Sequence, residues 1–514
     1  MNKLPTEVIV DILAILDIKE LLACRSSSPR YHLNSIVLQY HILLAASGMC
    51  DGPPSEVSTA ERMAALQTYN TAWRELTWSS YDTIDIPEYN DPQFSNGVIV
   101  TISNYGKSLT VHRLPSKLRR VEACEWTLTF DFGIAEFIMD ASQDLLALIP
   151  FDNVEADVFL ILTLSNGQPH PLAMPRNSNK RRKQSSALAI ELYDSDYKWS
   201  RIRFTHGQMN IHGDYIGTVV LEDLKIWNWK TGHQEWRLRL PAPNLSRQWF
   251  FLDNSYIVYD EDNREDPQSL CLRVCRFRCA FDTDPGTECV LEIRDLWRTP
   301  KLLYQSRVVS RATSPNGNDA CGREALFYPS AEDSLLIIEL CEDRRGSNPN
   351  ISYLHVPTRT LLSAYLSLTP KKEAIEDPEG PRNFVVDWKE WGLIVMKIYA
   401  VDVQFSKKGL SYGQRRIMWK YGTQDFRGLA HKAETEGRRV SVCDLHAGRI
   451  DQAIRCGAMQ GQQSQRVFSS PEIPLPWDLQ EGVPVALNFA MCGDALIIAK
   501  RWGQGNSRFH AFTF

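Results

Sequence analysis

The segment Leu224–Leu240 reads LKIWNWKTGHQEWRLRL and has the pattern of two β-strands joined by a turn. Along its first half, two sets of side chains alternate with the two-residue period of a strand. One set is Leu224 and Ile226, and the other is Lys225, Trp227 and Trp229. The letters KTGH supply the turn, and Trp236, Leu238 and Leu240 share one face of the returning strand. The segment therefore predicts a β-hairpin.

Strand-and-turn units of this kind recur through most of the chain. They can be drawn near 97–130, 134–173, 201–240, 247–306, 324–368, 383–450 and 484–514. Recurrent all-β units predict a β-propeller, in which each four-stranded sheet stacks on the next, here with about seven blades. Paired β-sandwiches are the alternative architecture. They need no repeated unit, but they usually show a boundary linker, and none is visible in this sequence.

The first 80 residues read as helical instead. Val8, Ile12 and Leu16 recur at every fourth position, which predicts a helix over residues 7–16. Shorter helices are expected over 18–24 and 29–44, and a loop over 48–57. Ser58 and Glu61 then form a capping box that opens an amphipathic helix. Its apolar stripe is Met63, Leu66, Tyr69, Trp73 and Leu76. The expected fold is mainly β with a small all-α N-terminal part: a helical domain over 1–46, a linker with the amphipathic helix over 47–90, and the propeller over 91–514.

The first predicted helix is too apolar to stand alone. Glu7 and Asp11 are its only charged residues, so it must be covered on more than one face. Two short companion helices can cover one face, and a domain of about 40 residues cannot bury much more by itself. The remaining apolar surface therefore predicts a contact with the rest of this chain or with another protein.

The N-terminal segment LPTEVIVDILAILDIKELLACRSSSPRYHLNSIV resembles an F-box. The family pattern is Leu-Pro, an acidic residue, an apolar helix, Leu-Leu, Cys-Arg and a basic–aromatic pair. The matching residues are Leu4, Pro5, Glu7, Ile12, Leu16, Leu21, Leu22, Cys24, Arg25, Arg30 and Tyr31. The sequence departs from the pattern at Ser27, where the family usually has valine, and at Pro29, where it usually has a basic residue. Residues 40–78 are also similar to the region that follows the F-box in a group of fungal F-box proteins with β-rich, propeller-like C-terminal halves.

This resemblance implies a function in protein degradation. F-box proteins are the substrate receptors of SCF-type ubiquitin ligases, in which they bind a Skp-family adaptor and, through it, a cullin. The implied three-helix F-box domain would bind the adaptor with Leu4, Pro5, Val8, Ile12, Leu16, Leu21 and Leu22. The propeller would bind a protein substrate whose identity the sequence does not indicate. Such a receptor is not an enzyme, since its contribution is to hold the substrate close to the ubiquitin-charged partner.

The composition of the chain limits which classes of partner and which cellular compartments are expected. The chain has 514 residues and a net charge of −5, so no overall basic character points to nucleic acid or to an anionic membrane. We find no apolar run of about 20 residues and no signal peptide, which predicts a cytoplasmic or nuclear protein. The basic run Lys180, Arg181, Arg182 and Lys183 is either a nuclear import signal or a solvated loop.

Motifs of catalysis and of metal or cofactor binding are absent from the sequence, so we expect no metal and no cofactor. The even spacing of Cys271, Cys275 and Cys279 places them on one face of a strand, without the second ligand pair of a zinc site. Trp227, Trp229 and Trp236 form either an aromatic binding platform or core packing between blades. Two other functions stay open: an adaptor-bound F-box scaffold outside the ligase, and a propeller enzyme or glycan-binding protein.

Overall fold

A computed structural model gives the architecture of the chain. It describes Val8, Leu13 and Glu20 and, beyond them, residues 35–87, 92–102, 106–116, 121–150, 158–173, 188–191, 209–220, 223–239, 249–262, 270–278, 288–293, 303–311, 326–329, 335–342, 350–358, 361–362, 383–386, 396–400, 411–412, 415–420, 439–444, 473–474, 486–492, 495–502 and 506–513. Within these ranges no helix combines the length and the apolar character needed to cross a membrane.

In the described part of the chain two α-helices, α3 (Ile36–Ala46) and α4 (Thr59–Glu75), precede the seven large sheets. The predicted capping box is confirmed, because the Glu61 N–H donates to Ser58 Oγ and the Ser58 N–H donates to Glu61 Oε2. Two expectations need correction. The third predicted helix begins at Ile36, since Ser35 is extended. The predicted loop over 48–57 contains strand β1 (Met49–Asp51), which pairs with the distant strand β20 (Phe327–Pro329).

The other strands form seven sheets of four or five strands in the described part of the chain. Sheet 1 contains β3 (Gln93–Ser95), β4 (Val98–Ile102), β5 (Ser108–Arg113) and β6 (Cys124–Thr129). Sheet 2 contains β7 (Ile134–Asp140), β8 (Leu145–Pro150), β9 (Val158–Thr163) and β10 (Leu188–Glu191), with the short 3-10 helix η1 (Ala141–Gln143) in its first turn. Sheet 3 contains β11 (Asn210–His212), β12 (Tyr215–Val220), β13 (Asp223–Asn228) and β14 (His233–Arg239). Sheet 4 contains β15 (Trp249–Phe251), β16 (Tyr256–Asp262), β17 (Leu270–Arg276), β18 (Glu288–Ile293) and the added strand β23 (Asn383–Val386).

Three sheets complete the set. Sheet 5 contains β19 (Leu303–Arg311), β21 (Leu335–Glu342), β22 (Asn350–Pro357) and β24 (Met396–Ala400). Sheet 6 contains β25 (Ser411–Tyr412), β26 (Arg415–Lys420), β27 (Arg439–Asp444) and β28 (Ile473–Pro474). Sheet 7 contains β29 (Ala486–Cys492), β30 (Ala495–Trp502), β31 (Asn506–Thr513) and β2 (Ser80–Pro87). The number of sheets agrees with the seven predicted units, but their bounds differ. Strand β19 starts sheet 5 instead of ending the fourth unit, and β23 and β24, both within the predicted unit 383–450, belong to sheets 4 and 5.

Sheet 3 shows how the sheets pack, because both of its faces are buried. Leu224 and Ile226 join a cluster with Trp249, Phe251 and other residues of sheet 4. On the opposite face, Trp227 and Trp229 join a cluster with residues of sheet 2. The alternation seen in the Leu224–Leu240 segment therefore fills two inter-sheet cores at once. The hairpin itself is confirmed, with Leu224 opposite Leu238 and Ile226 opposite Trp236.

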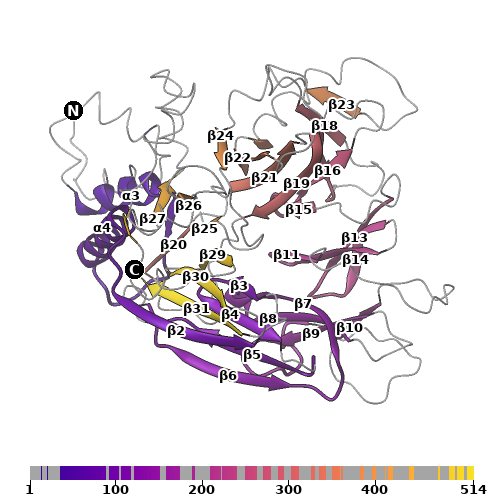
Figure 1. Cartoon of the computed structure of the whole chain (residues 1–514), viewed down its shortest axis with the longest axis horizontal. Coiled ribbons are helices and arrows are strands. Elements are labelled where there is room, and N and C mark those ends of the chain that lie inside the picture. Colours follow the sequence, from indigo (N-terminus) through magenta and orange to yellow (C-terminus); the bar gives the residue numbers. More distant parts are fainter. Residues whose placement is uncertain are drawn as a thin grey trace.

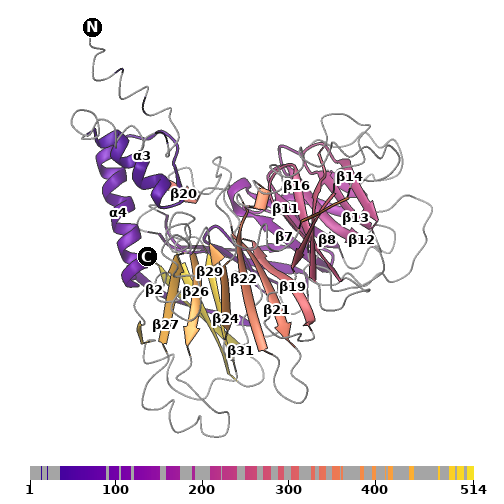
Figure 2. The same ribbon diagram turned by 90° about the horizontal axis from the view of Figure 1, so that it is seen from above.

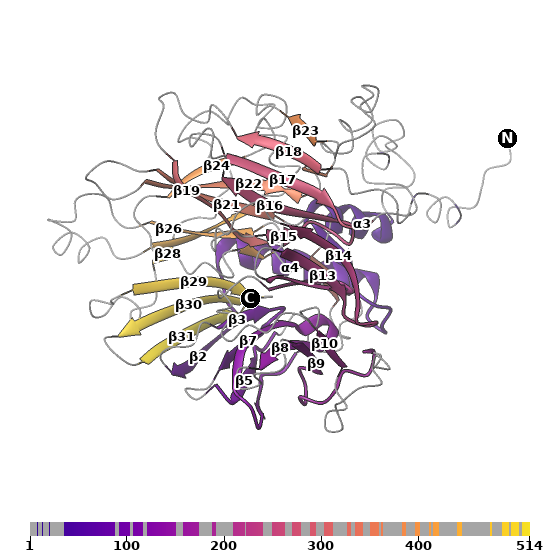
Figure 3. The ribbon, with the colours of Figure 1, turned by 90° about the vertical axis from the view of Figure 1, so that its right-hand side faces the viewer.

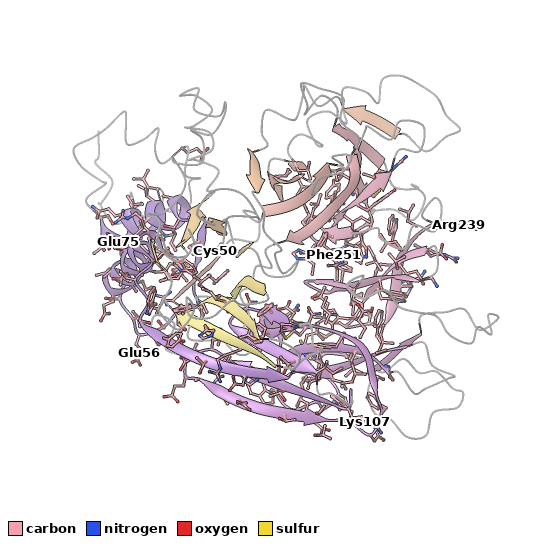
Figure 4. All side chains as sticks on the ribbon, in the orientation of Figure 1. Cys50, Glu56, Glu75, Lys107, Arg239 and Phe251 are labelled. Atoms are coloured by element: carbon pink, nitrogen blue, oxygen red, sulfur yellow. The ribbon has the colours of Figure 1, made fainter. Side chains whose placement is uncertain are left out.

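The sheets follow one another around the molecule (Figures 1 and 3). First strands contact first strands, from β3 through β7, β11 and β15 to β19, and from β25 through β29 back to β3. Consistent with this order, Phe251 on β15 lies towards the middle of the molecule and Arg239 on β14 lies at its periphery (Figure 4). A series of small, mainly antiparallel sheets whose last sheet contacts the first is a propeller-like fold, not a pair of sandwiches.

Strand β2 closes this series. It precedes every other strand of the seven sheets, yet it pairs with the final strand β31 in a register that runs from Ser80–Thr513 to Pro87–Asn506. Residues 80–87 lie in the range that the sequence assigned to the linker. Sheet 7 thus takes its outer strand from the N-terminal side of the chain and its other three strands from the C-terminal end.

The packing between sheets 3 and 4 leads to a test at Gly217 on β12. A Cβ atom added there would collide with Trp249 Cη2 and would lie 2.9 Å from Trp249 Cζ2. We expect Gly217→Ala to lower the free energy of unfolding by about 1–3 kcal/mol, as overpacking does. The change is measured as a shift in the urea unfolding midpoint of the full chain. Gln234→Ala, at an exposed position of β14 in the same sheet, is the control and should change stability by less than about 0.5 kcal/mol. An unchanged midpoint for Gly217→Ala would contradict the close approach of the Trp249 ring.

Candidate interaction surfaces

The predicted adaptor-binding residues lie in the part of the chain that is least described. Of the seven, Val8 is described, and it is helical and 40% exposed. The other six, Leu4, Pro5, Ile12, Leu16, Leu21 and Leu22, lie outside the described residues. Leu13 and Glu20 are also helical, and the other residues of the predicted helices over 7–16 and 18–24 lie outside the described residues.

Helix α3 carries the chain from this segment towards the propeller-like domain. Its sequence IVLQYHILLAA is apolar nearly all round, and it is buried on two sides. Leu38 is 0% exposed and Tyr40 is 2% exposed, although they project about 200° apart around the helix. At its N-terminal end Ile36 is 40% exposed. Helix α3, whose residues are mostly apolar, is therefore covered on more than one face.

Helix α4 connects α3 to the sheets, as Figure 2 shows. The predicted stripe is confirmed, since Leu66, Tyr69, Trp73 and Leu76 are all 3% exposed or less. They share one core cluster with Tyr40 and Leu44 of α3, Leu326 and Phe327 near β20, and Leu496, Ile498 and Phe512 of sheet 7. Within it, the rings of Tyr69 and Phe327 meet edge to face at 5.3 Å. Apolar packing therefore joins the helices to sheet 7 and to the β20 segment.

A buried arginine adds polar contacts to this apolar core. Arg62 on α4 is 5% exposed. Its Nη1 donates to Asp51 Oδ1 at 2.8 Å and to the Leu326 carbonyl oxygen at 3.1 Å. Its Nη2 donates to the Pro53 carbonyl oxygen at 2.6 Å and to Ser55 Oγ at 2.8 Å. The planar guanidinium, with five N–H donors, suits such a group of divergent acceptors. We call Arg62, Asp51, Tyr40 and the Leu326 carbonyl the Arg62 joint.

Tyr40 completes the joint from α3. Its hydroxyl donates to Asp51 Oδ1 at 2.7 Å, so both helices contact the same carboxylate. Burial of the ring, and then the neighbouring Asp51 carboxylate, raise the pKa of Tyr40 well above its ordinary value, against the opposing effect of Arg62. Tyr40 therefore stays a neutral donor at ordinary pH. The Gly52 N–H also donates to the Leu326 carbonyl oxygen at 2.9 Å, so β1 and β20 are joined beyond their ladder. Cys50, between these groups on β1, lies beside the helices (Figure 4).

A second surface follows α4, where Trp78 and Tyr81 are 39% and 40% exposed. Both rings contact Phe512 of β31, at centroid distances of 5.1 and 5.0 Å. The Tyr81 hydroxyl lies 2.7 Å from Nδ1 of the buried His510. These aromatic residues fix the start of β2 to the end of β31 and leave part of each ring facing solvent. No local pattern predicts this surface, because His510 and Phe512 lie more than 400 residues further along the chain than Trp78 and Tyr81.

The remaining predicted features divide between the core and the undescribed ranges. Trp227 and Trp229 are buried between sheets 2 and 3, and Trp236 packs against the cluster between sheets 3 and 4. Of the two predicted alternatives for these tryptophans, core packing is therefore the correct one. Cys275 is buried on β17, whereas Cys279 and the basic run of Lys180, Arg181, Arg182 and Lys183 lie outside the described residues. In the described part of the chain, no three His, Cys, Asp or Glu side chains gather as a metal site would require.

Comparison with known proteins gives structural neighbours only. No protein-family model matches the chain, and no curated protein matches it either. The WD40 domain of SCAP from fission yeast matches with 9% identity and a TM-score of 0.35, over 84% of this chain and 98% of that domain. A chain of the Mitotic Checkpoint Complex matches with 8% identity and a TM-score of 0.34, over 84% and 93% of the two chains. The N-terminal domain of Nup159 matches with 9% identity and a TM-score of 0.30, over 91% and 100%. At these scores the propeller-like assignment rests on the strand pairing itself.

The Arg62 joint predicts an alkaline sensitivity that depends on Tyr40. Tyr40→Phe removes the bond to Asp51, and we expect a loss of about 0.5–1.5 kcal/mol in the free energy of unfolding near pH 8. Because the folded-state pKa lies above the unfolded value of about 10, this stabilisation is present below pH 10 and is lost as the pH rises further. The difference between the two proteins should therefore shrink in urea titrations at about pH 10.5. A difference that is the same at both pH values would contradict the raised pKa of the buried Tyr40.

Proposed function

We propose that the chain is the substrate-receptor subunit of an SCF-type ubiquitin ligase. Its N-terminal helices bind a Skp-family adaptor, and through it a cullin, while the propeller-like domain binds a protein substrate. The observation that carries the proposal is the order of F-box residues from Leu4 to Tyr31 at the start of the chain. On this proposal the protein works in the cytoplasm or nucleus and performs no bond chemistry of its own.

Two structural observations support the proposal. Val8 is helical and 40% exposed, although valine is an apolar residue in an already apolar segment. An exposed apolar side chain there fits a surface that becomes buried against another protein. Secondly, the propeller-like domain is a common scaffold for protein interaction, since its loops surround one rigid core. Together these features support a protein that links two partners.

An adaptor-bound scaffold outside the ligase is the second candidate. It is favoured by Ser27 and Pro29, which depart from the F-box pattern near the third helix. The two candidates share the adaptor and differ in cullin recruitment. The burial of Trp227 and Trp229 removes them as an exposed aromatic binding platform.

Co-expression of the full chain with a Skp-family adaptor tests the proposal. We expect a stable complex by size-exclusion chromatography, and Leu4→Asp combined with Ile12→Asp should weaken it by about 100-fold or more, because each change places a charge where an apolar hot spot is expected. Gln67→Asp, on the exposed face of α4, is the matched control and should bind as the unmutated chain does.

Purified cullin added to the complex separates the two candidates. Recruitment of cullin supports the ligase receptor, whereas an adaptor complex that does not recruit cullin supports the scaffold. Absence of any complex with the unmutated chain would refute both.

A further inference from the structure

Helix α4 is held to the propeller-like domain at two places. Beyond its C-terminal end the chain runs directly into β2, where the Ser79 N–H donates to the Thr513 carbonyl oxygen at 2.7 Å. Towards its N-terminal end, Arg62 contacts the Leu326 carbonyl oxygen, which comes from the connection between β19 and β21 of sheet 5. The helix is therefore braced by sheet 7 at one end and by a connection of sheet 5 at the other.

The two attachments differ in size and kind. The β2–β31 ladder spans eight residues of each strand and belongs to sheet 7 itself. The β1–β20 ladder spans three residues of each strand and stands apart from the seven sheets. Beside this short ladder, the donors of Arg62 reach both sides, Asp51 on β1 and Leu326 next to β20. The second attachment thus has the shorter ladder and, besides the Gly52 N–H bond and the Tyr69–Phe327 contact, relies on the hydrogen bonds of Arg62.

We propose that Arg62, Asp51 and the Leu326 carbonyl form a clasp that sets the angle of the N-terminal helices relative to the propeller-like domain. Arg62 is the positioning residue of this clasp. When it is lost, β1 and α3 separate from β20, while α4 remains attached through β2 and the sheets stay folded. Asp51 tolerates this opening because its side chain is 46% exposed and can be solvated without Arg62.

A role for the clasp in substrate placement rests on the proposed function. If the N-terminal helices bind the adaptor, the angle at the clasp sets where the propeller-like domain holds its substrate relative to the rest of the ligase. Directional hydrogen bonds suit this task, because a planar guanidinium fixes several acceptors in one geometry, whereas apolar packing tolerates small rotations.

Hydrogen–deuterium exchange of the full chain tests the clasp directly. In Arg62→Met, we expect the amides of residues 36–51 and 326–329 to exchange at least about tenfold faster, because these segments open locally. The amides of β2 and β31 should keep their protection. Arg62→Lys, which keeps the charge and loses the five-donor fork, should lie between the two proteins. Arg74→Met is the matched control: Arg74 lies on the same helix, its side chain is 64% exposed, and its exchange pattern should match the unmutated chain.

The outcomes distinguish the proposed clasp from a general role of Arg62 in the stability of the fold. Faster exchange confined to residues 36–51 and 326–329 supports it. Equal exchange in Arg62→Met and the unmutated chain, or a comparable loss of protection in β2 and β31, overturns it. Adaptor binding is measured on the same proteins, and Arg62→Met should bind the adaptor with unchanged affinity. If the unmutated chain does not bind the adaptor, the proposed function fails while the exchange result still decides the clasp.

Discussion

The pairing of β2 with β31 is the constraint on which the rest of the structure depends. It joins residues 80–87 to residues 506–513, so most of the chain lies between the two strands that it connects. Without β2, β31 would be an open edge at the outside of sheet 7, with unpaired backbone groups along its length. With β2 in place, sheet 7 is complete and packs against sheet 1 through Ile497, Phe509 and Ala511. One antiparallel ladder thereby supplies a missing strand and fixes where the series of sheets begins and ends.

The direction of this pairing also decides where the helices lie. Because β2 is antiparallel to β31, its first residue, Ser80, lies beside Thr513, at the end of the sheet where β31 finishes. Helix α4 leads into that end, and its apolar stripe lies over Leu496, Ile498 and Phe512. The connection that carries β20 runs from the end of β19 to the start of β21, the corresponding end of sheet 5. Strand direction therefore brings two distant segments to the same end of the fold, where the Arg62 joint can form between them.

Local pattern was sufficient wherever both partners of a contact lie close in the sequence. The alternation of Leu224 and Ile226 with Trp227 and Trp229 predicted the hairpin, and the structure shows that each set faces a different neighbouring sheet. Likewise, Ser58 and Glu61 marked the start of α4 because a capping box spans only four residues. The pattern failed where the partner is remote. Nothing in GMCDGPPSEV indicates strand β1, because three residues become a strand only through Phe327–Pro329. Nor does the sequence mark Arg62 as buried, since one of its acceptors is the backbone of Leu326.

The same distinction explains why the fold is easier to infer than the site. A propeller-like core is built from many similar contacts between neighbouring sheets, so a repeated apolar pattern carries it even when single positions vary. The Arg62 joint is built once, from one guanidinium, one carboxylate and carbonyl groups that any residue could supply. Its specificity lies in the placement of backbone atoms, which composition and periodicity do not record. A contact of this kind is also the more easily altered by one substitution. Substitution of a single residue at the Arg62 joint can therefore change the orientation of the helices while the sheets that support them stay the same.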